Sequence, residues 1–186
     1  MKHLVVRETR IESLRVLERN SIDDSRGRFE RMFCQNELNS VLHGKTIQQV
    51  NKSLTKIEGT VRGMHFQNSP HSEIKIVSCL AGRVWDAAVD LRKGSPTFLQ
   101  WHGEVLDEEN GKSMIIPEGF AHGFQTLAAN CVMLYFHTAS YNATSEGAIN
   151  ALDPRVEIEW PKQIAERSER DMNHPMLPPD FSGITL

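Results

Sequence analysis

Apolar and polar residues alternate along most of the chain with the period of two that is typical of β-strands. Turn residues such as Ala81-Gly82, Asn110-Gly111 and Pro117-Glu118-Gly119 separate the alternating segments. Many short strands at close spacing favour a sandwich or a barrel over a fold of alternating strands and helices. The predicted strands are Leu14–Glu18, Phe29–Phe33, Ile47–Ser53, Thr60–Phe66, Ile74–Leu80, Val84–Leu91, Phe98–Val105, Ser113–Ile116, Phe120–Thr126 and Cys131–Thr138.

The remaining pattern predicts two helices, Gln35–Leu42 and roughly Pro161–Arg170. A length of 186 residues suits one domain that spans the whole chain, 1–186. No apolar run approaches the ~20 residues that cross a bilayer, and the charged N-terminal segment lacks the apolar core of a secretory signal. The pattern therefore predicts an all-β protein of the cytoplasm with no membrane partner.

Composition narrows the classes of partner. The formal net charge of -3 provides no general basic field, so we expect no nucleic acid partner. A ligand that carries phosphate is still compatible with this charge if a few arginines converge locally. Cys34, Cys79 and Cys131 are an odd number of cysteines without CxxC spacing, which is typical of reduced thiols in the cytosol.

The segment Val84–Leu91 shows the alternation most clearly, with Trp85 and Ala87 on one face and Asp86 on the other. Acidic residues on one face of a strand are typical of a solvated surface. They are also compatible with a barrel in which Asp86 points into a polar interior. Both interpretations stay open from the sequence.

Two segments rich in glycine and histidine are candidates for the functional site. They are GTVRGMHFQ, Gly59–Gln67, and GKSMIIPEGFAHGFQT, Gly111–Thr126. Their glycine, proline and histidine spacing resembles the two signature motifs of the cupin superfamily, although Thr126 stands where an Asn is usual. The resemblance implies a cupin-type jelly roll, an all-β sandwich or barrel with a few short helices.

The metal ligands of a metal-binding cupin are incomplete in these motifs. Gln67 stands where a second histidine is usual, and no Glu follows at the usual spacing. Only His65, His122 and a poorly placed His71 would remain, whereas three or four well-placed ligands are the usual requirement. We therefore expect no metal and no cofactor, which leaves His65 and His122 for proton chemistry, for binding or for structural hydrogen bonds.

Other polar residues on predicted strands extend the candidate site. Arg62 lies three residues before His65, and such residues are rarely buried together without a ligand or an ion pair. A regular strand directs these two side chains to opposite faces, so both serve one pocket only if the strand bulges, which Gly63 permits. Lys75 and Tyr135 also have structural interpretations, as a lysine at a strand end and as a core tyrosine with a paired hydroxyl.

Six segments together resemble the family of dTDP-4-dehydrorhamnose 3,5-epimerases and related sugar 3-epimerases, from about Asp24 to Asp171. The resemblance implies an isomerase of deoxysugar biosynthesis that inverts C3, C5 or both in a nucleotide-linked 4-keto-6-deoxyhexose, with dTDP as the expected nucleotide. It also implies a homodimer in which an N-terminal strand crosses to the partner. The segments are SRGRF (Ser25–Phe29), VRGMHFQ (Val61–Gln67), DLRKGSPTF (Asp90–Phe98), PEGFAHGF (Pro117–Phe124), LYFHT (Leu134–Thr138) and EIEWP (Glu157–Pro161).

The same resemblance implies roles in proton transfer. The family's basic histidine falls on His65, and the carboxylate that partners this histidine falls on Asp171. Its tyrosine acid falls on Tyr135, and its enolate-stabilising lysine falls on Lys75. Its second pocket histidine falls on His122. Inversion beside a ketone needs a base on one face of the sugar and an acid on the other, and these residue types suit both tasks.

A second group of positions matches residues that bind the substrate. Arg26, Arg62, Gln49 and Asn51 match positions that hold the nucleotide diphosphate or the sugar. Tyr141 resembles a tyrosine that lines the nucleotide or sugar site. The expected partner is therefore a nucleotide-diphosphate sugar, with arginine forks for the phosphate oxygens.

Three departures from the family pattern surround the expected substrate site. Lys52 stands where a His is frequent, Arg31 where a Glu is frequent, and Ser140 replaces one of a tyrosine pair. These changes affect the choice of nucleotide and sugar and leave the residues of proton transfer intact.

Three other functions are compatible with parts of the pattern. A metal-dependent cupin enzyme requires a ligand that Gln67 does not provide. A non-catalytic sugar-nucleotide-binding cupin would be expected to lose His65 or Tyr135, and both are present. A purely structural β-domain leaves the set of Arg62, His65 and Lys75 unexplained.

Overall fold

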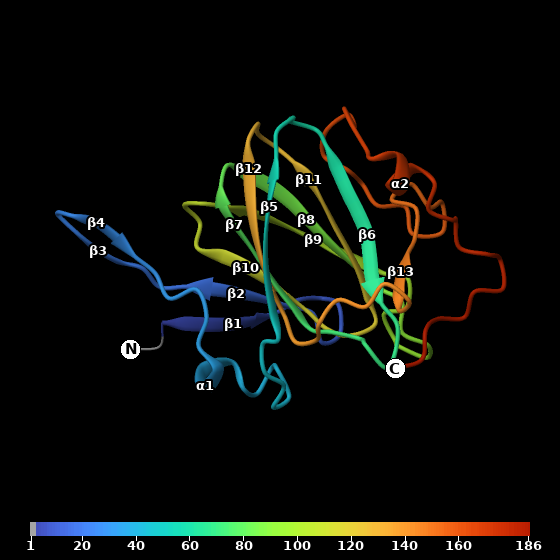
Figure 1. Ribbon diagram of the computed structural model, residues 1–186, viewed down its shortest axis with the longest axis horizontal. Helices are drawn as coiled ribbons and strands as arrows, with labels where there is room; N and C mark the ends of the chain where they lie inside the picture. Colours follow the sequence, from blue (N-terminus) through green and yellow to red (C-terminus); the bar gives the residue numbers. More distant parts are fainter. Residues whose placement is uncertain (1–2) are drawn as a thin grey trace.

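Two β-sheets packed face to face form the body of the molecule, which a computed structural model describes for residues 3–186 (Figure 1). All pairings between neighbouring strands of the two sheets are antiparallel. The six-stranded sheet has the order β1 (Leu4–Glu8), β2 (Arg15–Arg19), β10 (Lys112–Ile116), β7 (Lys75–Ala81), β12 (Cys131–His137) and β5 (Gln49–Thr55). The five-stranded sheet has the order β13 (Glu146–Ala148), β6 (Val61–Gln67), β11 (Phe120–Thr126), β8 (Arg83–Asp90) and β9 (Trp101–Asp107).

The architecture confirms the predicted all-β sandwich of the cupin type. Two short helices, α1 (Gln35–Leu38) and α2 (Glu169–Met172), are the α-helices among the described residues. Neither helix has the length and the apolarity to span a bilayer.

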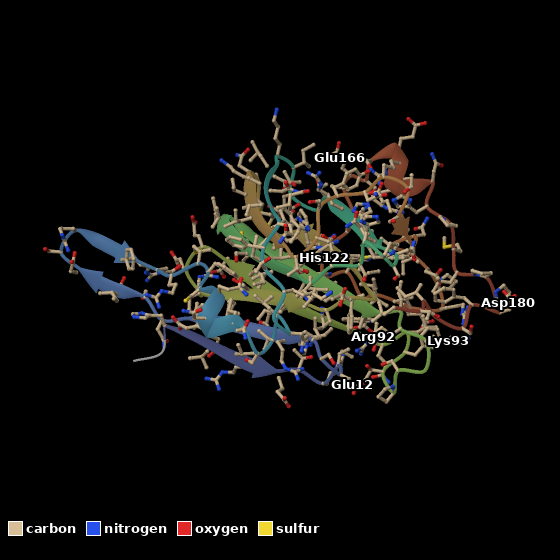
Figure 2. The ribbon with its side chains drawn as sticks, turned by 60° about the horizontal axis from the view of Figure 1, so that its bottom comes forward. Glu12, Arg92, Lys93, His122, Glu166 and Asp180 are labelled. Atoms are coloured by element: carbon tan, nitrogen blue, oxygen red, sulfur yellow. The ribbon has the colours of Figure 1, made fainter. Side chains whose placement is uncertain are left out.

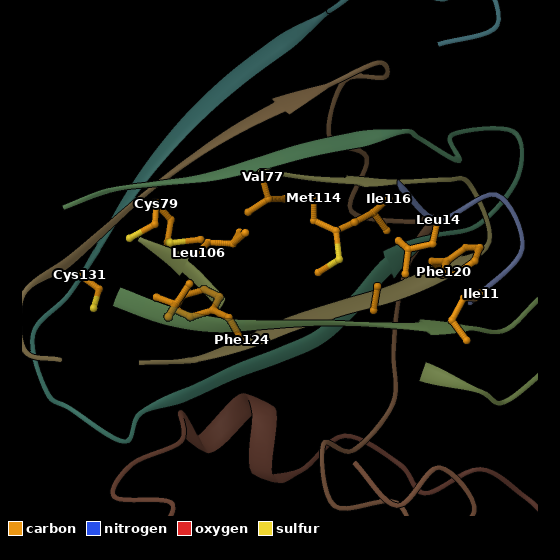
Figure 3. Packing of buried hydrophobic residues seen from close by; sticks show 13 residues of the cluster. Ile11, Leu14, Val77, Cys79, Leu106, Met114, Ile116, Phe120, Phe124 and Cys131 are labelled. Atoms are coloured by element: carbon orange, nitrogen blue, oxygen red, sulfur yellow. The ribbon is translucent and has the colours of Figure 1, made fainter. Parts of the chain in front are cut away.

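The space between the sheets is filled by a central cluster of side chains from β7, β8, β9, β10, β11 and β12, together with Ile11 and Leu14 (Figure 3). Strand β8 shows how the alternation is used. Val84 and Ala88 pack in this central cluster, whereas Ala87 and Val89 pack in a second cluster on the opposite face, beneath the C-terminal segments. Both faces of β8 are therefore buried. Asp86 is fully buried on the inward face, so the interpretation of a polar interior position is confirmed and the solvated one is wrong.

A hairpin of β3 (Ile22–Asp24) and β4 (Gly27–Phe29) projects from the body on the side of β2 (Figure 1). All six residues of its two strands are exposed, and Phe29 is 65% exposed. The predicted strand Phe29–Phe33 is wrong after its first residue, because β4 ends at Phe29. The chain then runs without regular structure to α1.

Other differences between the predicted and the observed helices and strands lie mostly in segments whose backbone pairs with strands far away in the sequence. The predicted helix Pro161–Arg170 is wrong, since Ala165 and Glu166 exchange backbone hydrogen bonds with Gly59 and Val61 and not with their own turn. Strand β1 was not predicted: Arg7 and Glu8 carry charges, and the residues beyond Leu4 remain at least partly exposed at the edge of the sheet. The three-residue strand β13 was also missed, and the predicted helix Gln35–Leu42 ends at Leu38.

Candidate functional site

A cavity of about 270 Å³ lies between the two sheets, beyond the end of the apolar core. His122 is buried in the interior of the molecule beside this cavity (Figure 2). Both sheets contribute polar side chains to the cavity, so a ligand would be enclosed between two walls. The lining residues are Asn51, Lys52, Ser53, Arg62, His65, Lys75, His122, Gly123, Phe124, Tyr135 and His137.

A bulge in β6 brings Arg62 and His65 to the same cavity. Strand β11 pairs His122 with His65 and Phe124 with Arg62, so Gly63 and Met64 on β6 oppose Gly123 alone. Gly63 has a φ of 131°, and a Cβ there would lie 2.6 Å from the Cα of Gly123. The bulge that Gly63 was expected to permit is confirmed, and only glycine fits this backbone.

His65 is held by a carboxylate from the far end of the chain. Its Nε2 lies 2.8 Å from Oδ1 of Asp171, which is 4% exposed. The other oxygen, Oδ2, accepts a hydrogen bond from the backbone N–H of Gly63 at 3.1 Å. Burial opposes ionisation of Asp171, but the hydrogen bonds from His65 and Gly63 outweigh it and lower its pKa to about 2. The carboxylate is thus ionised at neutral pH and orients the imidazole.

Tyr135 faces the cavity from the opposite wall. It lies on β12 of the six-stranded sheet, whereas His65 lies on β6 of the five-stranded sheet. Its hydroxyl is 3.0 Å from Oγ of Ser53, and its ring makes an edge contact with the ring of His122 at 6.4 Å. Burial raises the pKa of Tyr135 to about 12, so the phenol carries its proton at neutral pH.

The raised pKa of Tyr135 predicts how its phenol titrates. The chain has two tyrosines, Tyr135 and Tyr141. We expect the ultraviolet difference between the wild type and the Tyr135→Phe variant to show no phenolate absorbance below about pH 11, because burial disfavours the charged phenolate. A phenolate that formed near the ordinary pKa of about 10 would show that the hydroxyl is solvated.

Lys75 belongs to a buried ionic cluster that the sequence reasoning did not find. Its Nζ lies 3.2 Å from Oε1 of Glu73, and Nδ1 of His137 lies 2.8 Å from Oε2 of the same carboxylate. Burial opposes ionisation of Glu73, but His137 and Lys75 together hold the pKa of this carboxyl below its ordinary value. Lys75 does lie at the end of a strand, as the first residue of β7, but its side chain is only 12% exposed and is not directed into solvent.

His122 is the inner neighbour of His65 across the β6–β11 pairing. Its Nε2 lies 2.8 Å from Oδ1 of Asp86. Burial raises the pKa of Asp86, and the nearby imidazole opposes this effect. The cavity therefore contains two imidazole–carboxylate pairs on the same wall, of which the pair with His65 is the more exposed.

Arg62 stands at the mouth of the cavity. Its guanidinium makes no ion pair with any residue from 3 to 186, and its Nη1 is 3.4 Å from Oγ1 of Thr55. Arg62 and His65 also line a second hollow of about 450 Å³, whose wall includes Lys56 and Arg170. An exposed cation without a counterion, between two adjoining hollows, suits the phosphate oxygens of a ligand.

Three of the predicted substrate-binding residues lie outside the lining of the cavity. Arg26 is at the tip of the projecting hairpin, where its 88% exposed side chain pairs with Asp24. Within one chain, the prediction that Arg26 reaches the site is therefore not met. Gln49 lies at the start of β5, where its Oε1 accepts a hydrogen bond from the backbone N–H of Tyr141 at 2.9 Å.

Tyr141 connects this rim to the second hollow. Its hydroxyl donates to Oε2 of Glu146 at 3.0 Å, and the same carboxylate forms a close ion pair with Arg170. Glu146 and Arg170 were not predicted, and no local pattern marks them. His137 and Ser53 could have been found from the alternation, because they follow Tyr135 and Asn51 by two residues on the same strand faces.

The metal ligands considered from the sequence do not come together. Among residues 3–186, the side chains that form a group with metal-ligand spacing are His65, Asp171 and His174 and not His65, His122 and His71. Two of these three residues form the imidazole–carboxylate pair of the cavity.

The chain is similar to known proteins over most of its length. The family model described as dTDP-4-dehydrorhamnose 3,5-epimerase matches residues 8–178. The dTDP-4-dehydrorhamnose 3,5-epimerase of Salmonella typhimurium is 41% identical over 176 residues, which cover 94% of this chain and 96% of the relative.

Solved structures are similar over the same length. An epimerase of Legionella pneumophila in complex with dTDP-4-keto-L-rhamnose has a TM-score of 0.88 and 38% identity, covering 94% of this chain and 93% of that one. A 3'-monoepimerase of Streptomyces bikiniensis in complex with dTDP-quinovose has a TM-score of 0.83 and 30% identity, covering 90% and 85%.

Proposed function

The chain belongs to the dTDP-4-dehydrorhamnose 3,5-epimerase family, and from that premise we propose that it inverts C3, C5 or both in a dTDP-linked 4-keto-6-deoxyhexose. The observation that carries the proposal is the placement of His65 and Tyr135 on opposite sheets around one cavity. Inversion requires a base on one face of the sugar ring and an acid on the other. The cavity offers both groups, with the base oriented by a buried carboxylate.

His65 acts as the base in this proposal. Its Nε2 donates to Asp171, so Nδ1 is the nitrogen that accepts the proton from the carbon beside the ketone. The charge of Asp171 stabilises the imidazolium that forms. Lys75 places its ammonium group beside the developing O4 anion, and fixed positive charge of this kind is often the largest catalytic contribution.

Tyr135 returns a proton to the opposite face of the enolate. The phenol is protonated at neutral pH, and the enolate carbon is basic enough to accept this proton. Ser53 lies 3.0 Å from the hydroxyl and fixes its direction. Arg62 and Asn51 hold the diphosphate and the sugar at the mouth of the cavity.

The function is tested with dTDP-4-keto-6-deoxyglucose in D2O, with deuterium at C3 and C5 read by NMR. Deuterium together with inverted configuration at either carbon supports the epimerase and identifies the carbon. Unchanged substrate without deuterium, at high enzyme concentration, would contradict the proposal.

We further propose that the enzyme is a homodimer in which Arg26 serves the partner's site. The hairpin that carries Arg26 projects from the body with both strands exposed, and within its own chain Arg26 does not line the cavity (Figure 1). Its Phe29 exposes an apolar ring that a second copy would cover. We place this dimer in the cytoplasm, where the free thiols of Cys34, Cys79 and Cys131 stay reduced.

Mixing two impaired variants, assayed at a substrate concentration too low to saturate Arg26→Ala, tests the shared site. We expect Arg26→Ala to weaken substrate binding more than turnover, because a guanidinium fork grips phosphate oxygens. A mixed dimer of Arg26→Ala and His65→Ala contains one site with both residues intact if Arg26 acts on the partner. Activity should therefore return on mixing. If Arg26 acts within its own chain, mixing restores nothing.

No step of this mechanism uses a metal. We expect activity to survive prolonged treatment with EDTA, because the ammonium group of Lys75 supplies the charge that a Lewis acid would otherwise supply. Activity is measured after gel filtration, with and without added divalent ions. Loss of activity with EDTA, followed by recovery with one divalent ion, would contradict the expectation.

A further inference from the structure

His174 is a partly buried imidazole without a function in the proposed mechanism. It follows α2, and its side chain is 13% exposed. Its Nε2 is buried and makes no well-aligned hydrogen bond with the described residues. A buried polar atom without a partner costs free energy, so such an atom calls for an explanation. Nε2 lies 3.3 Å from Oδ1 of Asp171, the same oxygen that faces Nε2 of His65.

We propose that His65, Asp171 and His174 bind a zinc ion that switches the enzyme off. The three ligand atoms lie within 4.8 Å of one another. Two ligands of a tetrahedral zinc, with bonds of about 2.0–2.1 Å, are about 3.3 Å apart. The separation between His174 and Asp171 already has this value, and the one between His65 and Asp171 is 2.8 Å. A small outward shift of His65 opens the site.

The types of ligand suit a zinc ion. Two imidazoles and one carboxylate are a ligand set that zinc accepts, with a fourth position for water or substrate. The Gly63 N–H donates to the other oxygen of Asp171 and fixes the direction of the carboxylate, as hydrogen bonds to metal-binding carboxylates do. Positive charges near the ligands oppose a cation. Arg170 is compensated by its ion pair with Glu146, whereas Arg167 donates to the backbone oxygen of Asp171 at 2.7 Å and Arg62 lines the same hollow, so we expect them to lower the affinity for zinc. Two of the three ligands, His65 and Asp171, line the hollow of about 450 Å³.

Zinc and catalysis compete for the same imidazole. In the free pair, the proton on Nε2 of His65 points at Asp171, and Nδ1 has the lone pair. Coordination requires the lone pair on Nε2, so the proton of the neutral imidazole moves to Nδ1. An imidazole with a proton on Nδ1 cannot accept one from the sugar. This consequence rests on the proposed function, whereas binding of the ion does not.

Binding is measured first, by calorimetric titration of the EDTA-treated, gel-filtered protein with ZnCl2. We expect one site per chain, and the His174→Asn variant should bind at least about 10–100-fold more weakly. The matched control is His43→Asn, which removes an exposed histidine outside the site. Circular dichroism and a second variant, His174→Gln, distinguish a lost ligand from a disturbed fold. Equal zinc affinity in the wild type and a folded His174 variant would overturn the proposal.

Inhibition is measured second. We expect zinc to inhibit the wild type reversibly, with recovery on addition of EDTA. Each variant is compared with its own rate without zinc, and the His174 variants should need about 10–100-fold more zinc. If zinc binds through His174 but leaves the rate unchanged, the proposed inhibition is wrong. If the wild type has no epimerase activity, the proposed function fails while the binding result stands by itself.

Discussion

We expect the His65→Ala variant to lose deuterium exchange and epimerisation together, each by at least ~10²–10⁴-fold. The reason is the order of events, since no enolate forms until a base removes the first proton. The Asp171 carboxylate would remain buried without its imidazole, so it cannot replace the lost base from behind the cavity wall. The measurement is NMR of the sugar after incubation with enzyme in D2O, with both quantities read from one sample.

The His43→Ala variant is the control, because it removes an exposed histidine outside the cavity. It should exchange and invert at the wild-type rate. Residual exchange in His65→Ala near the wild-type level would mean that another group removes the proton. His122 would then be the next candidate, since it lines the same wall.

The Tyr135→Phe variant should separate the two activities. His65 can still remove a proton and return deuterium to the same face, so exchange persists. The inverted product should fall by about 10²-fold or more, because the acid on the other face is missing. The substitution keeps the ring that contacts His122 and His137, so the walls of the cavity stay in place. Exchange and inversion are again measured in D2O by NMR.

The Tyr141→Phe variant is the matched control for this substitution. It should change affinity and leave the ratio of inversion to exchange unchanged, because Tyr141 lies at the rim and bonds Glu146. Two results would contradict the role of Tyr135. Exchange abolished as completely as in His65→Ala would mean that the phenol acts before the enolate forms. Inversion at the wild-type rate would mean that water or another residue is the acid.

The sequence by itself determined the sheet content, the family and most of the cavity wall. Period-two alternation predicted the inner strands, and the comparisons confirm the family and the reaction class. Of ten predicted site residues, six line the cavity, and Asp171 lies behind His65. These successes have a common cause. Strand alternation and the short RGMHF and PEGFAHGF motifs are local, so adjacent residues carry the whole signal.

Only the tertiary structure decided the contacts between segments that are remote in sequence. It placed Glu73 between Lys75 and His137, and His174 beside Asp171. It also replaced the predicted helix near residue 166 with backbone pairing to the start of β6. It left Arg26 on a hairpin outside its own cavity. Each result depends on how two sheets and a C-terminal segment pack together, and burial of a carboxylate or pairing of a backbone has no local sequence signal.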